Sequence, residues 1–523
     1  MSLIHERLKA EQPNNETNAL EIIADRWVDA YPHSIRRIDG ATVFVANHTI
    51  RKNLYVLWTD SGEGVAAGFS GERIGDTEGG EHVLVCPMDH HNASAVRKIF
   101  DFTRPKLIGT DNSFGFGDRL GLANPAHLRA VRGTGFEAVL AQQSIRELER
   151  TERTPDEVMD VATWAVLQEG FTGGFGSDAD HLKTTEHIDS MAAAGYTMYT
   201  IDPGDHVVNE ADHLPAAELA VRAEELPWGG LEDTLAGVLS RYSDRPVTLP
   251  GDLVLEPSRE QVLRALVKYG APIAHTATMF RHLENTLPAS AFELEVSVDE
   301  TESVTSPFEH LLFASELRRL GVRWVGLAPR FVGHFEKGID FRGDLDLFRQ
   351  EYLKHLAIAE AFGGYKISIH SGSDKFSVYR VIGDLGRGRV HVKTAGTSYL
   401  EALRTLAEEE PNLFREILDF SRGLYEVERR TYHVSAQLDR VAAGHTLGHD
   451  ELPSMLDSDD ARQVLHVTFG RVLTERAPTG NLLYKDRLMD CLRRHESTHD
   501  RFIENHFQRH LRPFEGAGKG AER

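Results

Sequence analysis

The chain has 523 residues, of which 41% are hydrophobic and 26% are charged, as in a globular protein with a large core. Its formal net charge of -22 argues against a nucleic-acid partner, because phosphate binding depends on clustered lysines and arginines. The chain has only 2 cysteines, which argues against a disulfide framework or a cysteine zinc site. It shows no signal peptide and no apolar stretch long enough to cross a bilayer. We therefore expect a cytoplasmic protein that contacts no membrane.

Residues 1–105 are predicted to form a β-rich N-terminal portion. Three segments there have the β-branched and aromatic composition of strands: ATVFVANHTI, NLYVLWTD and HVLVCPMDHH.

Residues 106–400 repeat one unit: a short strand, a loop rich in Gly, Asp or His, and a helix. The expected strands are KLIGTDNS, FEAVLAQQS, GGFGSDADH, YTMYTIDPGDH, AFELEVSVDE, RWVGLAPR, YKISIHSGS and RVHVKTAG. Two of the helices begin with a capping-box pattern, at Thr154 with Glu157 and at Ser306 with Glu309. Eight alternating units predict a (β/α)8 TIM barrel in the α/β class. A doubly wound open sheet is the alternative, but no G-x-G-x-x-G follows a strand.

Two further segments lie outside this repeat. A helical insertion is expected near residues 207–257, within the fourth unit. Residues 401–523 are expected to form a helical C-terminal extension whose tail, EGAGKGAER, is disordered.

Histidines stand at the predicted ends of three barrel strands. His181 ends the third strand, His334 follows the sixth, and His370 ends the seventh. Barrel enzymes carry their chemistry at this edge, where barrel closure directs the strand ends toward one space. Converging imidazoles with open positions left over predict a catalytic site for one divalent cation. The affinity order favours zinc, with manganese, cobalt or nickel as alternatives.

Two carboxylates accompany these histidines. Glu295 is expected to face the barrel lumen, either as a catalytic acid or as a carboxylate neutralised by Lys183 or Lys366. Asp180 and His181 would point opposite ways in a regular strand, so both reach the site only where the chain turns. Asp180 then acts as a general base, or else it caps the following helix.

The segment HSGSDK offers backbone amides, hydroxyls and a lysine that suit an anion such as a carboxylate or phosphate. A second polar loop, FGFGDRLGL, contains an arginine that can clamp a carboxylate, and AQQS contains a glutamine suited to hydroxyl recognition. The alternative for such rim residues is a surface bridge. The predicted substrate-binding residues are Asp118, Arg119, Gln142, Lys183, Ser371, Ser373 and Lys375.

The motifs GSDADHLKT, TIDPGDHV, ELEVSVDET, KISIHSGSDKFS, FGFGDRLG and AQQSIRELERT together resemble the tagaturonate epimerase family, over roughly residues 106–400. The resemblance implies metal-dependent interconversion of D-tagaturonate and D-fructuronate. It also implies Asp180 as proton acceptor, Glu295 as proton donor and the three histidines as metal ligands. Asp299 and Glu300 are the alternatives to Glu295, since they lie just beyond it.

The site also resembles that of class II fructose-bisphosphate aldolases, whose phosphate loop reads H-G-G-S-G. Here Ser371 replaces the first glycine and Asp374 follows, which favours a carboxylate-bearing substrate over a bisphosphate.

Three functions are therefore compatible with the sequence. The first is a keto-uronate epimerase that inverts C4 by retro-aldol and aldol steps. The second is a metal-dependent aldolase that acts on a sugar acid and releases its fragments. The third is a non-catalytic sugar-acid-binding barrel. The sequence leaves the oligomeric state and the substrate's stereochemistry open.

Overall fold

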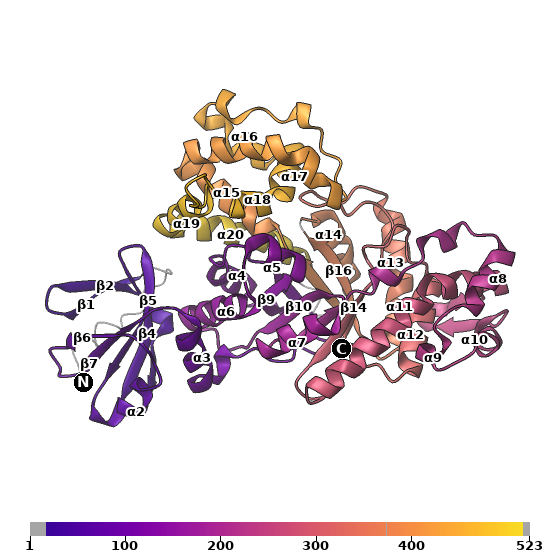
Figure 1. The fold of residues 1–523 in the computed structure, drawn as a ribbon, viewed down its shortest axis with the longest axis horizontal. Helices are drawn as coiled ribbons and strands as arrows, with labels where there is room; N and C mark the ends of the chain where they lie inside the picture. The colour runs from indigo at the N-terminus through magenta and orange to yellow at the C-terminus, as the bar shows by residue number, and fades with distance from the viewer. Residues whose placement is uncertain (1–16, 373, 516–523) are drawn as a thin grey trace.

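The computed structural model describes residues 17–372 and 374–515. Its centre is a closed barrel of parallel strands in the order β10-β11-β14-β15-β16-β17-β8-β9 (Figure 1). In chain order the barrel strands are β8 (Ser113–Phe116), β9 (Glu137–Ser144), β10 (Gly176–Leu182), β11 (Met198–Ile201), β14 (Glu293–Ser297), β15 (Gly326–Ala328), β16 (Lys366–Gly372) and β17 (Val390–Thr394). The predicted (β/α)8 barrel is confirmed.

The first barrel strand lies later in the chain than the sequence pattern suggested. The expected strand KLIGTDNS reaches only Ser113, the residue at which β8 begins. Gly109 has a φ of 64°, which interrupts extended backbone, and Leu107 is exposed. Phe114 and Phe116 are fully buried and provide the core side chains of this strand.

The helices around the barrel are α4 (Asn124–Val131), α5 (Ile145–Thr151), α6 (Pro155–Glu169), α7 (Thr185–Ala193), α11 (Arg259–Thr286), α12 (Pro307–Arg319), α13 (Leu345–Ala361), α14 (Phe376–Leu385) and α15 (Thr397–Glu409). Both predicted capping boxes are present, Thr154 with Glu157 before α6 and Ser306 with Glu309 before α12.

The N-terminal portion is an antiparallel sheet in the order β1-β2-β4-β5-β7-β6, with β3 paired to β4. Its elements are β1 (Asn18–Ile23), β2 (Arg26–Ala30), β3 (Arg36–Ile38), β4 (Ala41–His48), β5 (Arg51–Trp58), α2 (Glu63–Ala66), β6 (Glu72–Asp76), β7 (His82–Cys86) and α3 (His90–Ile99). One face of the sheet packs with Trp164 and Leu167 of α6, which attaches this portion to the barrel.

The insertion after β11 is mainly helical, as expected, but it also contains a short hairpin. Its elements are α8 (Ala216–Glu224), α9 (Trp228–Leu231), α10 (Leu235–Tyr242), β12 (Val247–Leu249) and β13 (Leu253–Leu255). The apolar side chains of the helices pack on the first turns of α11, and those of the hairpin pack on Leu311 of α12 and Ile358 of α13.

The C-terminal helices α16 (Pro411–Glu428), α17 (Asp459–Val467), α18 (Phe469–Thr474) and α19 (Lys485–Arg494) share a core with α15. The last helix, α20 (Glu496–Leu511), returns to the barrel, where Phe507 packs edge to face on Phe114. The predicted disordered tail lies almost wholly outside the described residues.

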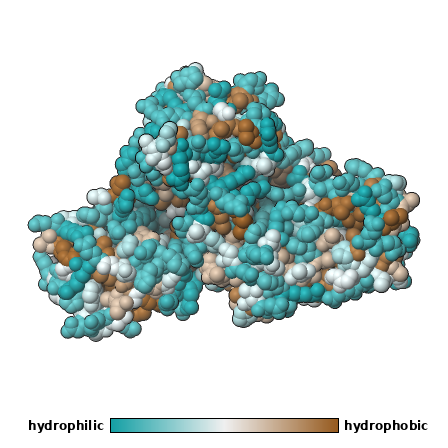
Figure 2. Space-filling view, in the orientation of Figure 1, coloured by the Kyte–Doolittle hydropathy of each residue, from teal (hydrophilic) through white to brown (hydrophobic). Residues whose placement is uncertain are grey.

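The face of the molecule in Figure 2 is mostly hydrophilic, in keeping with the charge of the chain. Among the described helices, none is both long enough and apolar enough to cross a membrane.

Candidate active site

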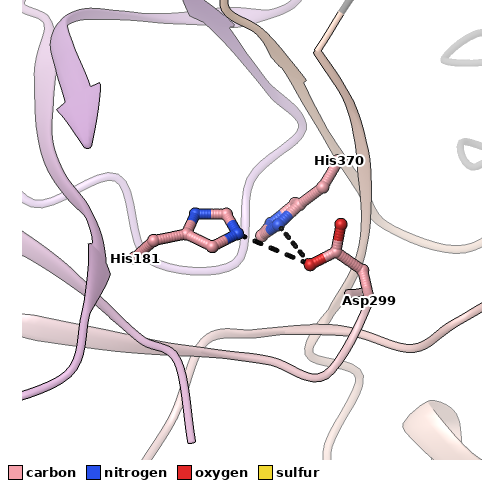
Figure 3. Close-up of side chains that lie close together, drawn as sticks. All are labelled: His181, Asp299 and His370. Carbon is pink, nitrogen blue, oxygen red and sulfur yellow. Dashed lines mark ion pairs between the residues drawn. The ribbon is translucent and has the colours of Figure 1, made fainter. Parts of the chain in front are cut away.

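Two of the predicted histidines meet at the C-terminal edge of the barrel, together with an aspartate. Asp299 Oδ1 lies 3.5 Å from His181 Nε2 and 3.4 Å from His370 Nδ1 (Figure 3). Donor atoms that share one cation at about 2.0–2.2 Å lie roughly 3.0–3.5 Å apart. His181 Nε2 is buried and has no hydrogen-bond partner among the described residues. Two imidazoles and a carboxylate at this spacing fit a divalent cation.

The backbone at the end of β10 brings Asp180 and His181 into the same space. His181 has a φ of 54°, and the register of β10 against β11 shifts between Ala179 and Leu182. This break allows Asp180 Oδ1 to lie 2.8 Å from His181 Nδ1. The turn that the sequence required at this junction is present, and Asp180 faces the site.

His334 does not join this cluster, contrary to the three-histidine expectation. Strand β15 ends at Ala328, and the following loop carries His334 outward. There its backbone pairs with Arg342, and its exposed ring stacks on His433 with the ring centroids 5.7 Å apart. In the described arrangement Asp299 occupies the third position instead.

Lys393, which the sequence analysis missed, connects the carboxylates of the site. Its Nζ lies 2.6 Å from Asp178, 2.8 Å from Asp180 and 2.9 Å from Glu295, and its side chain is only 4% exposed. In β17, His391 and Lys393 alternate with buried valines. That alternation was the available signal for a lysine in the lumen.

This network fixes the charges of the two predicted catalytic carboxylates. Burial raises the pKa of Asp180, but His181 and Lys393 outweigh it and hold that pKa well below the usual range. Burial likewise raises the pKa of Glu295, and Lys393 with His370 holds it well below its usual value. Both groups are therefore carboxylates, and Glu295 Oε1 lies 2.6 Å from His370 Nε2.

The lysines expected to neutralise Glu295 have other hydrogen-bond partners. Lys183 Nζ pairs with Asp205 at 2.6 Å on the rim. Lys366 Nζ donates to Ser113 Oγ at 3.1 Å.

Two predicted substrate-binding residues line the pocket around the cluster. Arg119 is buried against Glu147 at 2.8 Å and stacks on Phe469, yet its Nη1 has no hydrogen-bond partner among the described residues. Gln142 donates to the carbonyl of Thr394 at 3.1 Å, and its Oε1 is similarly without a partner. Both are equipped to bind a polar ligand, and Arg119 suits a carboxylate.

Asp118 and Lys375 have structural roles, which corrects the sequence prediction. Asp118 accepts hydrogen bonds from the backbone amides of Leu120, Gly121 and Ala123, so it organises a turn. Lys375 is fully buried, and its Nζ donates to backbone carbonyls that include those of Glu336 and Ile339.

The side chains of the two serines of the expected anion loop lie outside the described part of the structure. Ser373 lies outside the described residues, and only the backbone of Ser371, within β16, is described.

The C-terminal portion covers the site. Tyr432 and His466 line the narrow cavity beside the cluster, whose volume is about 50 Å³. An adjoining cavity of about 440 Å³ shares Tyr432, Arg146 and Lys337 with it. The cationic side chains along both cavities suit an anionic substrate.

Similarity in sequence to known proteins identifies the family. A family model described as tagaturonate epimerase matches residues 31–514. The chain is 40% identical over 491 residues to the tagaturonate/fructuronate epimerase of Thermotoga maritima, covering 94% of this chain and 98% of that protein.

Crystal structures agree with this assignment. Those of fructuronate-tagaturonate epimerase UxaE from Cohnella laeviribosi, native and with glycerol bound, superpose with a TM-score of 0.87 at 35% identity. The match covers 93% of this chain and 96% of the crystallised one. The chain is therefore an epimerase of the isomerase class, and it belongs to the tagaturonate epimerase family.

Proposed function

We propose that the chain interconverts D-tagaturonate and D-fructuronate at C4 with the help of one divalent cation. The names of the relatives support the substrate pair. The main support for the chemistry is the pairing of each imidazole with its own carboxylate, His181 with Asp180 and His370 with Glu295.

The position of inversion favours a retro-aldol route. Numbered from the hydroxymethyl end, the substrate ketone is at C2, so it acidifies C3 and not C4. A base removes the proton of the C4 hydroxyl, the C4 oxygen becomes an aldehyde, and the C3–C4 bond breaks. Its electron pair passes to C3 and the C2 carbonyl as an enediolate. Rotation of the aldehyde and re-addition to its other face invert C4.

The residues of the site have matching roles in this route. Asp180 takes the proton of the C4 hydroxyl and returns it after re-addition. Lys393 keeps Asp180 and Glu295 ionised, so Glu295 orients the His370 imidazole as a carboxylate and does not act as the proton donor. Arg119 binds the carboxylate, so the aldehyde fragment stays attached while it rotates about C4–C5.

The cation would be held by His181, His370 and Asp299, the donors that lie at ligand spacing. It would stabilise the negative charge of the enediolate oxygens as a Lewis acid. Zinc is the first candidate by affinity order, with manganese, cobalt and nickel next. His334 would become a ligand only after its loop had turned inward from His433.

Proton NMR of the protein with each uronate tests the proposal. The two uronates should interconvert, and in deuterated water the C4 hydrogen should remain, because C4 never loses it. Solvent deuterium at C4 at the turnover rate would exclude the retro-aldol route while leaving the epimerase assignment intact. Accumulation of dihydroxyacetone and a three-carbon aldehyde acid at that rate would identify an aldolase instead.

A further inference from the structure

A second group of metal-ligating side chains lies apart from the active site. His506 and His510 stand four residues apart on α20, which places both rings on one face of the helix. They meet Asp374, which lies just before α14, and all three residues are buried. The group shares no residue with the active-site cluster.

The hydrogen bonds of His510 leave a lone pair without a partner. Its Nδ1 lies 3.0 Å from the backbone carbonyl oxygen of His506, which can only accept, so Nδ1 carries the hydrogen. In the neutral ring, Nε2 is then an acceptor, yet it faces Asp374 Oδ1 at 3.3 Å. Nε2 has no hydrogen-bond partner among the described residues. Two acceptor atoms whose lone pairs face each other at this distance repel each other. A cation between the two atoms would relieve this repulsion.

The distances within the group suit a bound ion. Asp374 Oδ1 lies 2.8 Å from His506 Nε2 and 3.3 Å from His510 Nε2. Donor atoms around a tetrahedral ion with bonds of about 2.0–2.1 Å are separated by roughly 3.3 Å. Small shifts of the His506 ring would bring all three donors to that spacing.

The outer partners of the three side chains are those that usually orient metal ligands. His506 Nδ1 lies 3.3 Å from Glu401 Oε1, and His510 Nδ1 faces a backbone carbonyl. Arg462 holds the other carboxylate oxygen of Asp374 at 2.6 Å, so Oδ1 is the oxygen that faces the two imidazoles.

A water molecule or a hydroxyl can complete the coordination. A cavity of about 460 Å³ reaches Asp374 and His506, so the group is open to solvent on one side. Thr397 Oγ1 lies 2.7 Å from Asp374 Oδ1 and would hydrogen-bond a fourth ligand there.

We propose that Asp374, His506 and His510 bind one divalent cation of the zinc type, separate from the active-site ion, and that it fixes α20 to Asp374, just before α14. The position of α20 in the fold gives such a link a structural role. α20 is the last α-helix of the described residues, and its Phe507 packs on Phe114 of the barrel strand β8.

Metal counting on the full chain tests the site. Protein stripped with a chelator and reloaded with Zn²⁺ should hold two ions per chain, measured by mass spectrometry after desalting. His510→Ala and His370→Ala should each hold one, and the double variant none. His499→Ala is the matched control, since His499 is a buried histidine of the same helix outside the group, and it should hold two.

The count also separates this proposal from the active-site one. If His370→Ala holds as many zinc ions per chain as the unaltered protein while His510→Ala holds fewer, only the proposed active-site metal is refuted. An equal count in His510→Ala and His499→Ala overturns the site proposed here.

A measurement on the unaltered protein covers the case in which His510→Ala fails to fold. Anomalous diffraction from zinc-loaded crystals should show a peak between Asp374 and the two histidines. Density at the active site alone overturns the proposal.

Discussion

Lys393 Nζ lies 2.8 Å from Asp180 Oδ1, although 213 positions separate the two residues in the chain. Strands β8 and β9 stand between β17 and β10 in the barrel, so this contact crosses the lumen. The same ammonium reaches Glu295 at 2.9 Å. One lysine thus links the two carboxylates on which the proposed reaction depends.

Lys393→Met should reduce kcat by roughly a hundredfold or more, because Asp180 and Glu295 lose the charge that keeps them ionised and in place. Steady-state kinetics and circular dichroism together measure this. Lys366→Met is the matched control, since it also removes a buried lysine from a barrel strand, and its kcat should fall far less. Equal losses in the two variants would assign Lys393 a structural role only.

Asp180→Asn should lower kcat by roughly a hundredfold or more while the metal content stays unchanged, since the amide keeps the size of the side chain but cannot accept the C4 hydroxyl proton. Turnover by NMR and metal analysis of the same sample check this. Wild-type kcat in Asp180→Asn would refute the assignment of the base.

Active-site metal content should identify the third ligand. His181→Ala, His370→Ala and Asp299→Ala should each lose the active-site ion, because each removes one donor from a group of three. His334→Ala should keep the ion, because the His334 ring stacks on His433 outside the cluster. Loss of the ion from His334→Ala, with retention by Asp299→Ala, would mean that the loop after β15 turns inward to bind the cation.

Arg119→Gln should raise the KM for the uronate about 10- to 100-fold, because one charge-assisted hydrogen bond contributes roughly 1.5–3 kcal/mol. Lys183→Ala serves as control, since Lys183 is paired with Asp205 on the rim. Its KM should stay near that of the wild type. An unchanged KM in Arg119→Gln would exclude this arginine as the carboxylate anchor.

Acid should destabilise the fold through buried neutral histidines. His310 Nδ1 lies 2.9 Å from His355 Nδ1, and burial lowers the pKa of His355 to about 3 and that of His310 well below its usual value. The unfolded chain titrates near pH 6.5, so it binds more protons than the folded chain below that pH.

Above about pH 6.5 these two histidines therefore leave the free energy of unfolding unchanged. Between that pH and about 3 the free energy of unfolding falls by up to about 1.4 kcal/mol per pH unit for each histidine. Urea titrations at several pH values measure this slope. His355→Gln should reduce this slope by the contribution of about one bound proton, whereas replacement of the exposed His213 should leave the slope unchanged. An unaltered slope in His355→Gln would show that the acid sensitivity arises elsewhere.

The sequence by itself determined the barrel, because its signals are local. Strand composition, the capping boxes at Thr154 and Ser306, and the repeated unit each act within a few residues. Placing His181 and His370 at strand ends was enough to predict that they converge, since every strand of a closed parallel barrel delivers its end to the same rim.

The tertiary structure decided which side chains complete the site. His334 and Asp299 both follow barrel strands, and only the path of each loop determines that Asp299 reaches the imidazoles. Lys393 meets Asp180 because the barrel closes, and Tyr432 reaches the pocket because the C-terminal helices fold back over it. Such contacts depend on the packing of distant segments, which no local pattern in the chain encodes.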